Sequence, residues 1–235
     1  MRAVSRTHVG NVRPTNQDAL LMQPGRYGLF GVADGMGGHK AGDVASRLAV
    51  ENLARVLTNA QPREDLLRGA VEEINALIYE EQKKDASLSG MGTTLTVIWE
   101  DESRVLLGHV GDSRAYLLRD GKLQQISQDH SMVGEMLRDG LITLEQAMRH
   151  PYRNVITRAV GADADVQVDI TVLDKQAGDI YLLCSDGLYE YISMERMEQT
   201  LLAFSMDEAA DLFMNLALQG GGRDNISLVI AEVTA

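Results

Sequence analysis

The sequence predicts a layered α+β fold, in which antiparallel sheets are covered by helices. Between residues 93 and 126, short segments rich in β-branched and aliphatic residues follow one another through tight turns, as in antiparallel hairpins. Helical segments stand in groups before and after these strands. Strands in hairpins with helices grouped between them favour layered α+β packing.

The first third of the chain mixes strands with two helices. We expect strands at 19–22 and 29–33, joined by a turn at Gly25. Apolar residues then share one helical face after Gly42, and a second amphipathic helix is expected after Pro62. These apolar faces are interpreted as core contacts without a catalytic role.

The middle of the chain is rich in strands, and a polar helical stretch follows them. Asp120-Gly121 predicts a tight hairpin turn, and residues 131–153 read as an insertion between sheet elements. Within that insertion, Asp139-Gly140 is expected to end one helix and Thr143 to cap another. The remaining expected strands are 93–99, 104–110, 114–118, 122–126, 154–160, 166–173, 180–184 and 226–230, and the remaining helices are 193–204 and 206–219.

The composition indicates a globular protein, and a sequence without an evident repeat, low-complexity tract or linker favours one domain spanning residues 1–235. Hydrophobic residues make up 45% of the chain, and the formal net charge is −12, which disfavours nucleic-acid binding because phosphate backbones attract basic patches. No segment approaches the roughly 20 apolar residues of a membrane span, and no signal peptide is expected. The single cysteine, Cys184, is interpreted as a buried thiol, compatible with a reducing, cytoplasmic location.

Two aspartates follow apolar runs that read as buried strands. Asp34 follows residues 29–33, and Asp186 follows residues 180–185. A carboxylate at the mouth of a buried strand is unfavourable unless a cation or several donors face it. Together with Asp224 near the C-terminus, these residues indicate an oxygen-rich metal site.

The dipeptide Asp-Gly occurs four times, and its ordinary role is a turn. We keep that interpretation at 120–121 and 139–140. At 34–35 and 186–187 the preceding apolar run favours a ligand role, and the glycine is expected to let the chain turn sharply and present a carbonyl to an ion.

Carboxylates, carbonyls and water suit Mg²⁺ or Mn²⁺, whereas one cysteine and five scattered histidines give no zinc pattern. Two such ions, about 3.5–4 Å apart, can share a carboxylate and acidify a bridging water. Near the N-terminus, Arg13 offers a guanidinium for a phosphate and Asp18 a carboxylate for a water. On these two residues alone, a surface arginine and a turn aspartate are the better interpretation.

Taken in order, seven motifs resemble those of the metal-dependent serine/threonine protein phosphatases, the PPM family of type 2C. The resemblance covers almost the entire chain, and seven motifs in family order are hard to produce by chance. They are Arg13-x-x-Asn16-Gln17-Asp18, Val32-Ala33-Asp34-Gly35-Met36-Gly37-Gly38-His39, Gly92-Thr93-Thr94, Gly111-Asp112-Ser113-Arg114, Asp129-His130-Ser131, Ser185-Asp186-Gly187 and Arg223-Asp224-Asn225.

The resemblance implies a four-layer α-β-β-α sandwich with two central antiparallel sheets. By analogy, Asp34 bridges two metal ions, the Gly35 carbonyl binds the second ion, and Asp186 and Asp224 hold the first. Asp112, with Asp186, matches the position of a third, looser ion in bacterial members.

The resemblance also implies roles for two residues near the N-terminus: Asp18 would position metal-bound water, and Arg13 would bind the substrate phosphate. The implied reaction is direct hydrolysis of phosphoserine or phosphothreonine by a water or hydroxide that bridges two Mn²⁺ or Mg²⁺ ions. Residues 131–153 match the family's flap, which influences substrate choice. The implied partners are phosphoproteins, including a bacterial serine/threonine kinase, and we expect a cytoplasmic monomer without nucleic-acid or membrane partners.

One position departs from the eukaryotic relatives, which have a histidine directly after Asp-Gly as the proposed acid. Here that position is Met36, which cannot donate a proton. His39 is a possible substitute, although a packing role is the better interpretation. The leaving group would otherwise take its proton from water at the metal centre.

Two alternatives remain at the level of sequence. One is a catalytically inactive regulatory module with the same fold, which is disfavoured because Asp34, Asp186 and Asp224 are all present. The other is a different metal-dependent phosphoesterase such as a nuclease, which the acidic composition disfavours.

Overall fold

Two antiparallel sheets form the centre of the computed structural model, which describes residues 1–37 and 41–234. One sheet contains β1 (Arg2–His8), β7 (Arg114–Arg119), β8 (Lys122–Gln125), β10 (Ile180–Cys184) and β11 (Ile226–Glu232). The other contains β2 (Asp18–Gln23), β3 (Leu29–Met36), β4 (Gly92–Thr93), β5 (Leu95–Glu100), β6 (Arg104–Val110) and β9 (Asp169–Asp174). The helices are α1 (Ala41–Leu57), α2 (Glu64–Lys84), the 3₁₀ turn η1 (Ala86–Leu88), α3 (Met132–Arg138), α4 (Leu144–Met148), α5 (Asp186–Tyr189), α6 (Met194–Ala203) and α7 (Met206–Gly220).

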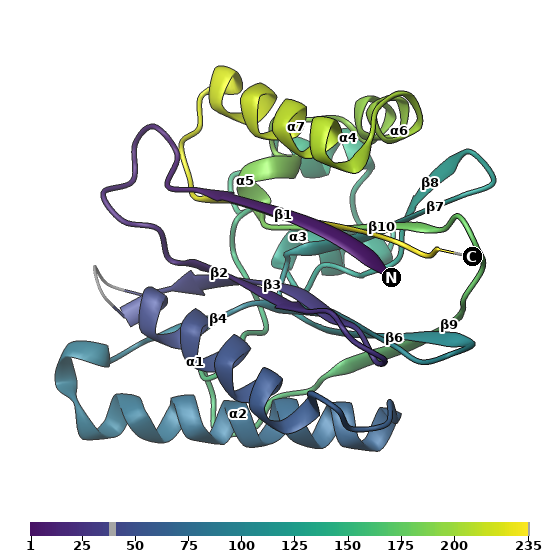
Figure 1. Ribbon diagram of the computed structural model, residues 1–235. Coiled ribbons are helices and arrows are strands. Elements are labelled where there is room, and N and C mark those ends of the chain that lie inside the picture. The colour runs from purple at the N-terminus through teal and green to yellow at the C-terminus, as the bar shows by residue number, and fades with distance from the viewer. Residues whose placement is uncertain (38–40, 235) are drawn as a thin grey trace.

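The sheets pack face to face, and helices cover both outer faces (Figure 1). The strand order is β1-β11-β10-β7-β8 in the first sheet and β2-β3-β5-β6-β9 in the second, with β4 paired to β3. In Figure 1, α6 and α7 lie over the first sheet, and α1 and α2 lie over the second. The four-layer α+β sandwich expected from the sequence is therefore confirmed.

Three apolar layers hold the sandwich together. Leu53 of α1 packs in one cluster with Trp99 of β5. Phe30 of β3 and Tyr181 of β10 belong to the cluster between the sheets, and Phe213 of α7 belongs to the cluster on the outer side of the first sheet. Since both faces of each central strand are buried, β5, β6 and β10 are apolar almost throughout.

Several local expectations are confirmed. Asp120 and Gly121 have φ angles of 51° and 75°, as the tight hairpin between β7 and β8 requires. Thr143 caps α4 through a capping box, and α3 ends at Asp139. Both long helices of the first third, α1 and α2, begin within two residues of Gly42 and Pro62.

Other expectations are wrong at the level of elements. The expected strand at 154–160 does not form, and only isolated bridges occur there, Thr93 with Val160 and Ser131 with Ile156. The expected strand at 93–99 is split at Thr94, where the Asp34 N–H donates to Thr94 Oγ1 instead of to the Thr94 carbonyl. Three elements, β1, η1 and α5, have no counterpart in the sequence-based assignment.

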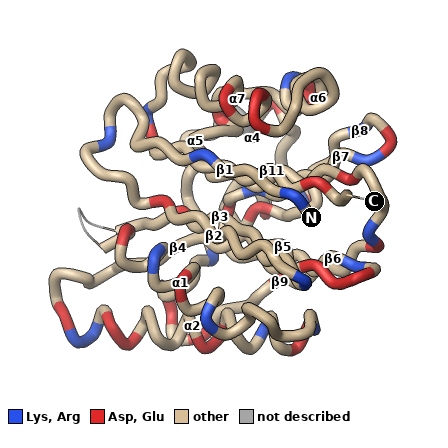
Figure 2. Tube along the Cα trace, in the orientation of Figure 1, with Lys and Arg blue, Asp and Glu red and all other residues tan. Residues whose placement is uncertain are grey.

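Charged side chains of both signs are spread over the helical layers (Figure 2). None of the helices in the described part of the chain combines the length and the apolar character that a membrane crossing requires.

Candidate active site

Asp34 lies inside β3 rather than after its end. The strand continues to Met36, because Gly35 and Met36 pair with Thr93 and Gly92 of β4. The backbone N–H of Asp34 donates to Thr94 Oγ1 at 2.9 Å, and its carbonyl accepts from Thr93 Oγ1 at 3.0 Å. The expectation that the strand runs out before Asp34 is thus wrong, and the carboxylate is held by a paired strand.

Gly35 is required by close packing and not by a turn. A Cβ at this position would lie 2.1 Å from the carbonyl oxygen of Gly42 and 2.5 Å from that of Gln17. The Gly35 N–H donates to the same Gln17 carbonyl at 3.1 Å. The β3 backbone is therefore clamped between the start of α1 and the segment that leads into β2, and the expected sharp turn at Gly35 is absent.

Asp18 is hydrogen-bonded to Ser185, the residue directly before Asp186. Asp18 begins β2, and Asp186 is the first residue of α5, directly after Ser185. Ser185 Oγ donates to Asp18 Oδ2 at 2.9 Å. Within the described residues, Asp18 Oδ1 and Asp186 Oδ1 are buried and have no hydrogen-bond partner. Each of these two oxygens therefore has an unused lone pair in the protein interior.

Asp112 is placed by the loop between β6 and β7. Its side chain is buried, with 6% exposure. The preceding Gly111 has a φ of 107° and packs on Thr94, so a side chain there would clash. The sequence indicated Asp112 only through its family motif, whereas the structure explains its burial by this tight loop.

Arg13 and Asp224 meet at the mouth of the site. Arg13 Nη2 donates to Asp224 Oδ2 at 2.6 Å, and the Asn225 N–H donates to Asp224 Oδ1 at 2.8 Å. The hydrogen bond to Asp224 is the main reason why the pKa of Arg13 is raised. Asn225 in turn ties the 9–17 loop to this corner, because its side chain donates to the carbonyls of Val9 and Thr15.

These side chains converge on one cavity of about 240 Å³. It contains six of the seven residues singled out from the sequence, since Asp18 is not among its lining residues and lies beside it on β2. The lining residues are Arg13, Gln17, Asp34, Gly35, Met36, Gly37, Asp112, Asn154, Ile156, Asp186 and Asp224.

Sequence reasoning missed Asn154 and Ile156 as residues of this cavity. They follow the 131–153 segment, and we expected them to begin a strand. Their segment instead follows residues 131–153 as irregular chain, and an isolated bridge joins Ile156 to Ser131. No local pattern marks such residues, because only the folded chain brings them to the cavity.

The electrostatics of the site are those of crowded carboxylates. Burial, and then the neighbouring charges of Asp18 and Asp186, raise the pKa of Asp34 well above its usual range. Burial and the charge of Asp112 likewise raise the pKa of Asp186. The pKa values of Asp18 and Asp112 rise to about 6, in both cases mainly through burial. Such a cluster is unfavourable when ionised, and a cation relieves it.

The donor set fits hard divalent cations. The cavity offers carboxylates and the Gly35 backbone, and two buried carboxylate oxygens nearby have no partner. Within residues 1–37 and 41–234, however, no three acidic, histidine or cysteine side chains lie close enough together to hold an ion by themselves. The oxygen donors of the cavity suit Mg²⁺ or Mn²⁺ better than zinc, which prefers cysteine and histidine ligands.

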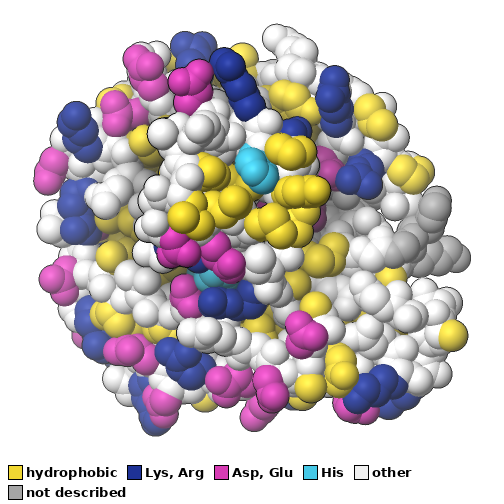
Figure 3. All heavy atoms as spheres, turned by 180° about the vertical axis from the view of Figure 1, so that it is seen from behind, with side chains coloured by type: hydrophobic (Ala, Val, Ile, Leu, Met, Phe, Trp, Pro, Cys, Tyr) yellow, Lys and Arg dark blue, Asp and Glu magenta, His cyan; other side chains and the backbone are white. Residues whose placement is uncertain are grey.

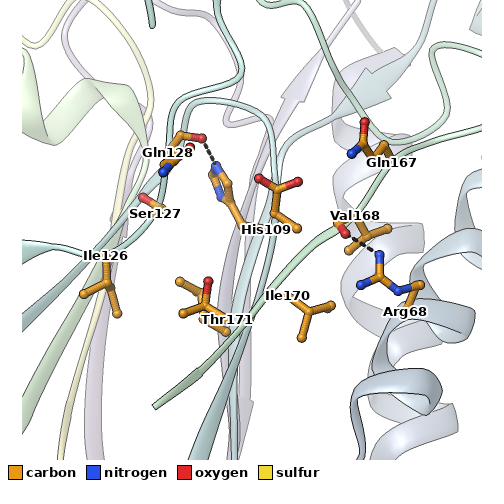
Figure 4. A pocket seen from close by; sticks show the side chains of 11 residues that line it. Arg68, His109, Ile126, Ser127, Gln128, Gln167, Val168, Ile170 and Thr171 are labelled. Carbon is orange, nitrogen blue, oxygen red and sulfur yellow. Dashed lines mark hydrogen bonds between the residues drawn. The ribbon is translucent and has the colours of Figure 1, made fainter. Parts of the chain in front are cut away.

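The histidines of the described part of the chain form no metal-binding cluster. His39 lies outside the described residues. His109 is buried between Thr96 Oγ1 and the Gln128 carbonyl, and burial lowers its pKa to about 4. A larger cavity of about 360 Å³ lies beside His109 and β9, where Arg68 donates to the Val168 carbonyl (Figure 4). Both His109 ring nitrogens and Arg68 Nη1 have hydrogen-bond partners within the protein.

Comparison with known proteins identifies the family. The family model described as protein phosphatase 2C matches residues 6–219. A serine/threonine phosphatase, stp, of Listeria monocytogenes is 40% identical over 99% of this chain and 96% of its own length. The serine/threonine protein phosphatase PstP of Mycobacterium tuberculosis is 42% identical over 99% of this chain and 45% of its own length.

Solved structures agree. The crystal structure of the Mycobacterium tuberculosis phosphatase PstP/Ppp superposes with a TM-score of 0.93 at 40% identity, covering 100% of this chain and 99% of that one. The catalytic domain of PstP in complex with two manganese ions gives a TM-score of 0.90 at 39% identity, covering 100% and 98%. These relatives favour the enzyme over the inactive binding module and the nuclease. The chain belongs to the protein phosphatase 2C family and is a metal-dependent serine/threonine protein phosphatase.

Proposed function

We propose that this phosphatase acts through two Mg²⁺ or Mn²⁺ ions held at Asp34, the Gly35 carbonyl, Asp186 and Asp224, with Asp112 serving a third, looser ion. The observation that carries this proposal is the convergence of four carboxylates on one cavity, with raised pKa values for three of them. When bound, such ions neutralise phosphoryl oxygens and acidify the water that attacks phosphorus. Manganese is supported by the printed description of the PstP complex.

Asp18 and Arg13 would act on water and on substrate respectively. Asp18 has one oxygen fixed by Ser185 and the other free, so it is suited to orient a water and to accept its proton. Arg13 lies at the mouth of the cavity, where its guanidinium can donate to a phosphate in a fork geometry. Phosphate binding then competes with the Arg13–Asp224 ion pair. Met36 has no proton to give, so the leaving alkoxide takes its proton from water.

The substrate and partner assignments are finer proposals. We infer that the substrates are phosphoserine and phosphothreonine proteins, as the names of the relatives suggest. We also propose that a serine/threonine protein kinase is among these phosphoprotein partners. We further propose a cytoplasmic monomer and a single domain, residues 1–235, in which residues 131–153 form a flap that tunes substrate choice. Light scattering of the purified protein tests the monomeric state. Fractionation of the source cells tests the cytoplasmic location.

The two-ion proposal is tested with Asp34→Asn. The variant should lose nearly all Mn²⁺-dependent phosphate release from a phosphothreonine peptide, and chelation should abolish wild-type turnover. Asp120→Asn is the matched control, because it changes an Asp-Gly dipeptide in the β7–β8 hairpin where asparagine also tolerates a positive φ. Normal turnover by Asp34→Asn would refute the assignment.

A further inference from the structure

Tyr189 joins the two chain segments that carry Asp186 and Asp112 to the cavity from different sheets. Asp186 opens α5 after β10 of the first sheet, whereas Asp112 follows β6 of the second. Tyr189 lies three residues after Asp186 on the same helical turn, and its hydroxyl donates to the Asp112 carbonyl at 3.1 Å. One short helix therefore carries a carboxylate of the site and a hydrogen bond to the loop that carries another.

Arg114 adds a second contact between the same two segments. It lies two residues after Asp112, and its guanidinium carbon is 3.7 Å from the centroid of the Tyr189 ring. The guanidinium is held in place by Asp129, to which Nη2 donates at 2.7 Å. The ring of Tyr189 is thus covered by a fixed cation while its hydroxyl bonds to the backbone, so the two segments are joined at two points.

Other bonds hold the neighbours of Asp112 but come from elsewhere. The Gly111 N–H donates to His130 Nδ1 at 3.0 Å, and the Ser113 hydroxyl shares a 2.7 Å bond with Thr94 Oγ1. These contacts attach the loop to the base of the flap and to the second sheet. The Tyr189 hydrogen bond differs because it joins the 111–113 loop to α5, the helix that begins with Asp186.

We propose that Tyr189 is a positioning residue, which holds Asp112 in register with Asp186 through its hydroxyl and through the stacked Arg114. The inference rests on the proposed function in taking Asp112 and Asp186 as the pair that serves the looser ion. Tyr189 itself touches neither substrate nor ion. Its effect should therefore be confined to the 111–113 loop and to the weak site.

Tyr189→Phe is the sharp test, because it removes only the hydroxyl and leaves the ring under Arg114. In the metal-free protein, amide hydrogen exchange at residues 111–113 should become about three- to tenfold faster, as expected for the loss of one hydrogen bond. In Mn²⁺ calorimetry, the weak binding event should weaken several-fold while the tight events persist. Turnover of an aryl phosphate should fall in kcat with KM unchanged.

Tyr181→Phe is the matched control, because it removes another buried tyrosine hydroxyl. Unlike that of Tyr189, the Tyr181 hydroxyl has no hydrogen-bond partner within the described residues. It should leave the exchange at 111–113 and the weak binding event unchanged. The proposal is overturned if Tyr189→Phe exchanges like wild type at 111–113, or if exchange rises uniformly over the chain together with a fall in Tm. The exchange measurement needs no metal, so it can contradict the role of Tyr189 while Asp34→Asn still supports the proposed function. Equally, the exchange result can support the role of Tyr189 while Asp34→Asn contradicts the two-ion proposal.

Discussion

Asp18 and Asp34 lie directly opposite each other on the neighbouring antiparallel strands β2 and β3. Like charges at directly opposite positions of a sheet are destabilising, and the charge of Asp18 contributes to raising the pKa of Asp34. The fold thus places the unfavourable Asp18–Asp34 pair among the other buried carboxylates of the site. This arrangement is expected where a bound cation, rather than the protein alone, balances the charge.

The first prediction concerns that pair. Asp18→Asn should raise the free energy of unfolding of the metal-free protein by about 0.5–1 kcal/mol, because it removes the like charge but keeps an oxygen for Ser185 Oγ. The same variant should lower kcat strongly. Urea unfolding in chelator and steady-state kinetics in Mn²⁺ measure the two effects. A variant that is both less stable and fully active would contradict the role given to Asp18.

Arg13 offers a prediction on substrate binding. Arg13→Ala should raise KM for an aryl phosphate by tenfold or more and weaken inhibition by inorganic phosphate, because the bidentate donor is lost. Arg26→Ala is a control, since Arg26 also forms an ion pair with a carboxylate but at an exposed site, with Glu102. Unchanged phosphate inhibition in Arg13→Ala would show that the guanidinium serves Asp224 alone.

Stability should depend on pH through the buried carboxylates. Burial raises the pKa of Asp112 to about 6, so the folded metal-free protein binds this proton more tightly than the unfolded chain. The contribution of Asp112 to the free energy of unfolding therefore becomes more favourable as pH falls through the interval from about 6 to about 4. His109 acts in the opposite direction over the same interval, because its pKa is lowered to about 4.

A difference measurement separates these two effects. Asp112→Asn should remove the carboxylate contribution, so that its stability relative to wild type is greater at pH 7 than at pH 4 by on the order of 2 kcal/mol. Urea unfolding in chelator at the two pH values gives this difference. If the gap between the two proteins is the same at both pH values, Asp112 ionises normally in the folded state.

Two glycine substitutions should have opposite signs. Gly35→Ala places a Cβ against the backbone of Gly42 and should destabilise the protein by roughly 1–3 kcal/mol or more. Gly69→Ala is the matched control within α2, where nothing lies within 4 Å of the added Cβ. It should stabilise the protein by about 0.5–1 kcal/mol, because alanine is the better helix former. Thermal unfolding of both variants checks the pair.

The flap presents an exposed apolar surface. Leu141 and Leu144 are 68% and 66% exposed. Hydrophobic side chains gather near the centre of the face turned away in Figure 1, where α3 and α4 lie (Figure 3). Large exposed apolar side chains close to a catalytic cavity are typical of contact surfaces for macromolecules. Changing both leucines to serine should lower kcat/KM for a phosphoprotein several-fold while leaving aryl phosphate hydrolysis unchanged.

Leu202→Ser is the control for the flap variant, because Leu202 is 56% exposed on α6, outside the flap. It should affect neither substrate. Equal losses on the protein and the small substrate in the flap variant would place those leucines in the catalytic scaffold instead.

Much of the fold followed from local patterns. The ranges of β6 and β10 agree with the sequence-based ranges 104–110 and 180–184, because their apolar runs are flanked by turn residues. β1 was missed because its seven residues include only two apolar ones, the adjacent Ala3 and Val4, so no alternating pattern marks it. It is fixed by pairing with β11 at the other end of the sequence. The strand expected at 154–160 failed for the converse reason, since its β-forming residues find no partner strand.

The sequence by itself determined which residue types form the site. Hard oxygen donors, a guanidinium and glycines in a fixed order can be recognised from the sequence alone. Tertiary structure decided which of them meet. Asp112, Asp186 and Asp224 share one cavity only because two sheets stack and their connecting loops end at the same edge. It also brought in Asn154 and Ile156 and set Tyr189 against Asp112, since contacts between residues far apart in sequence depend on packing, which no local pattern encodes.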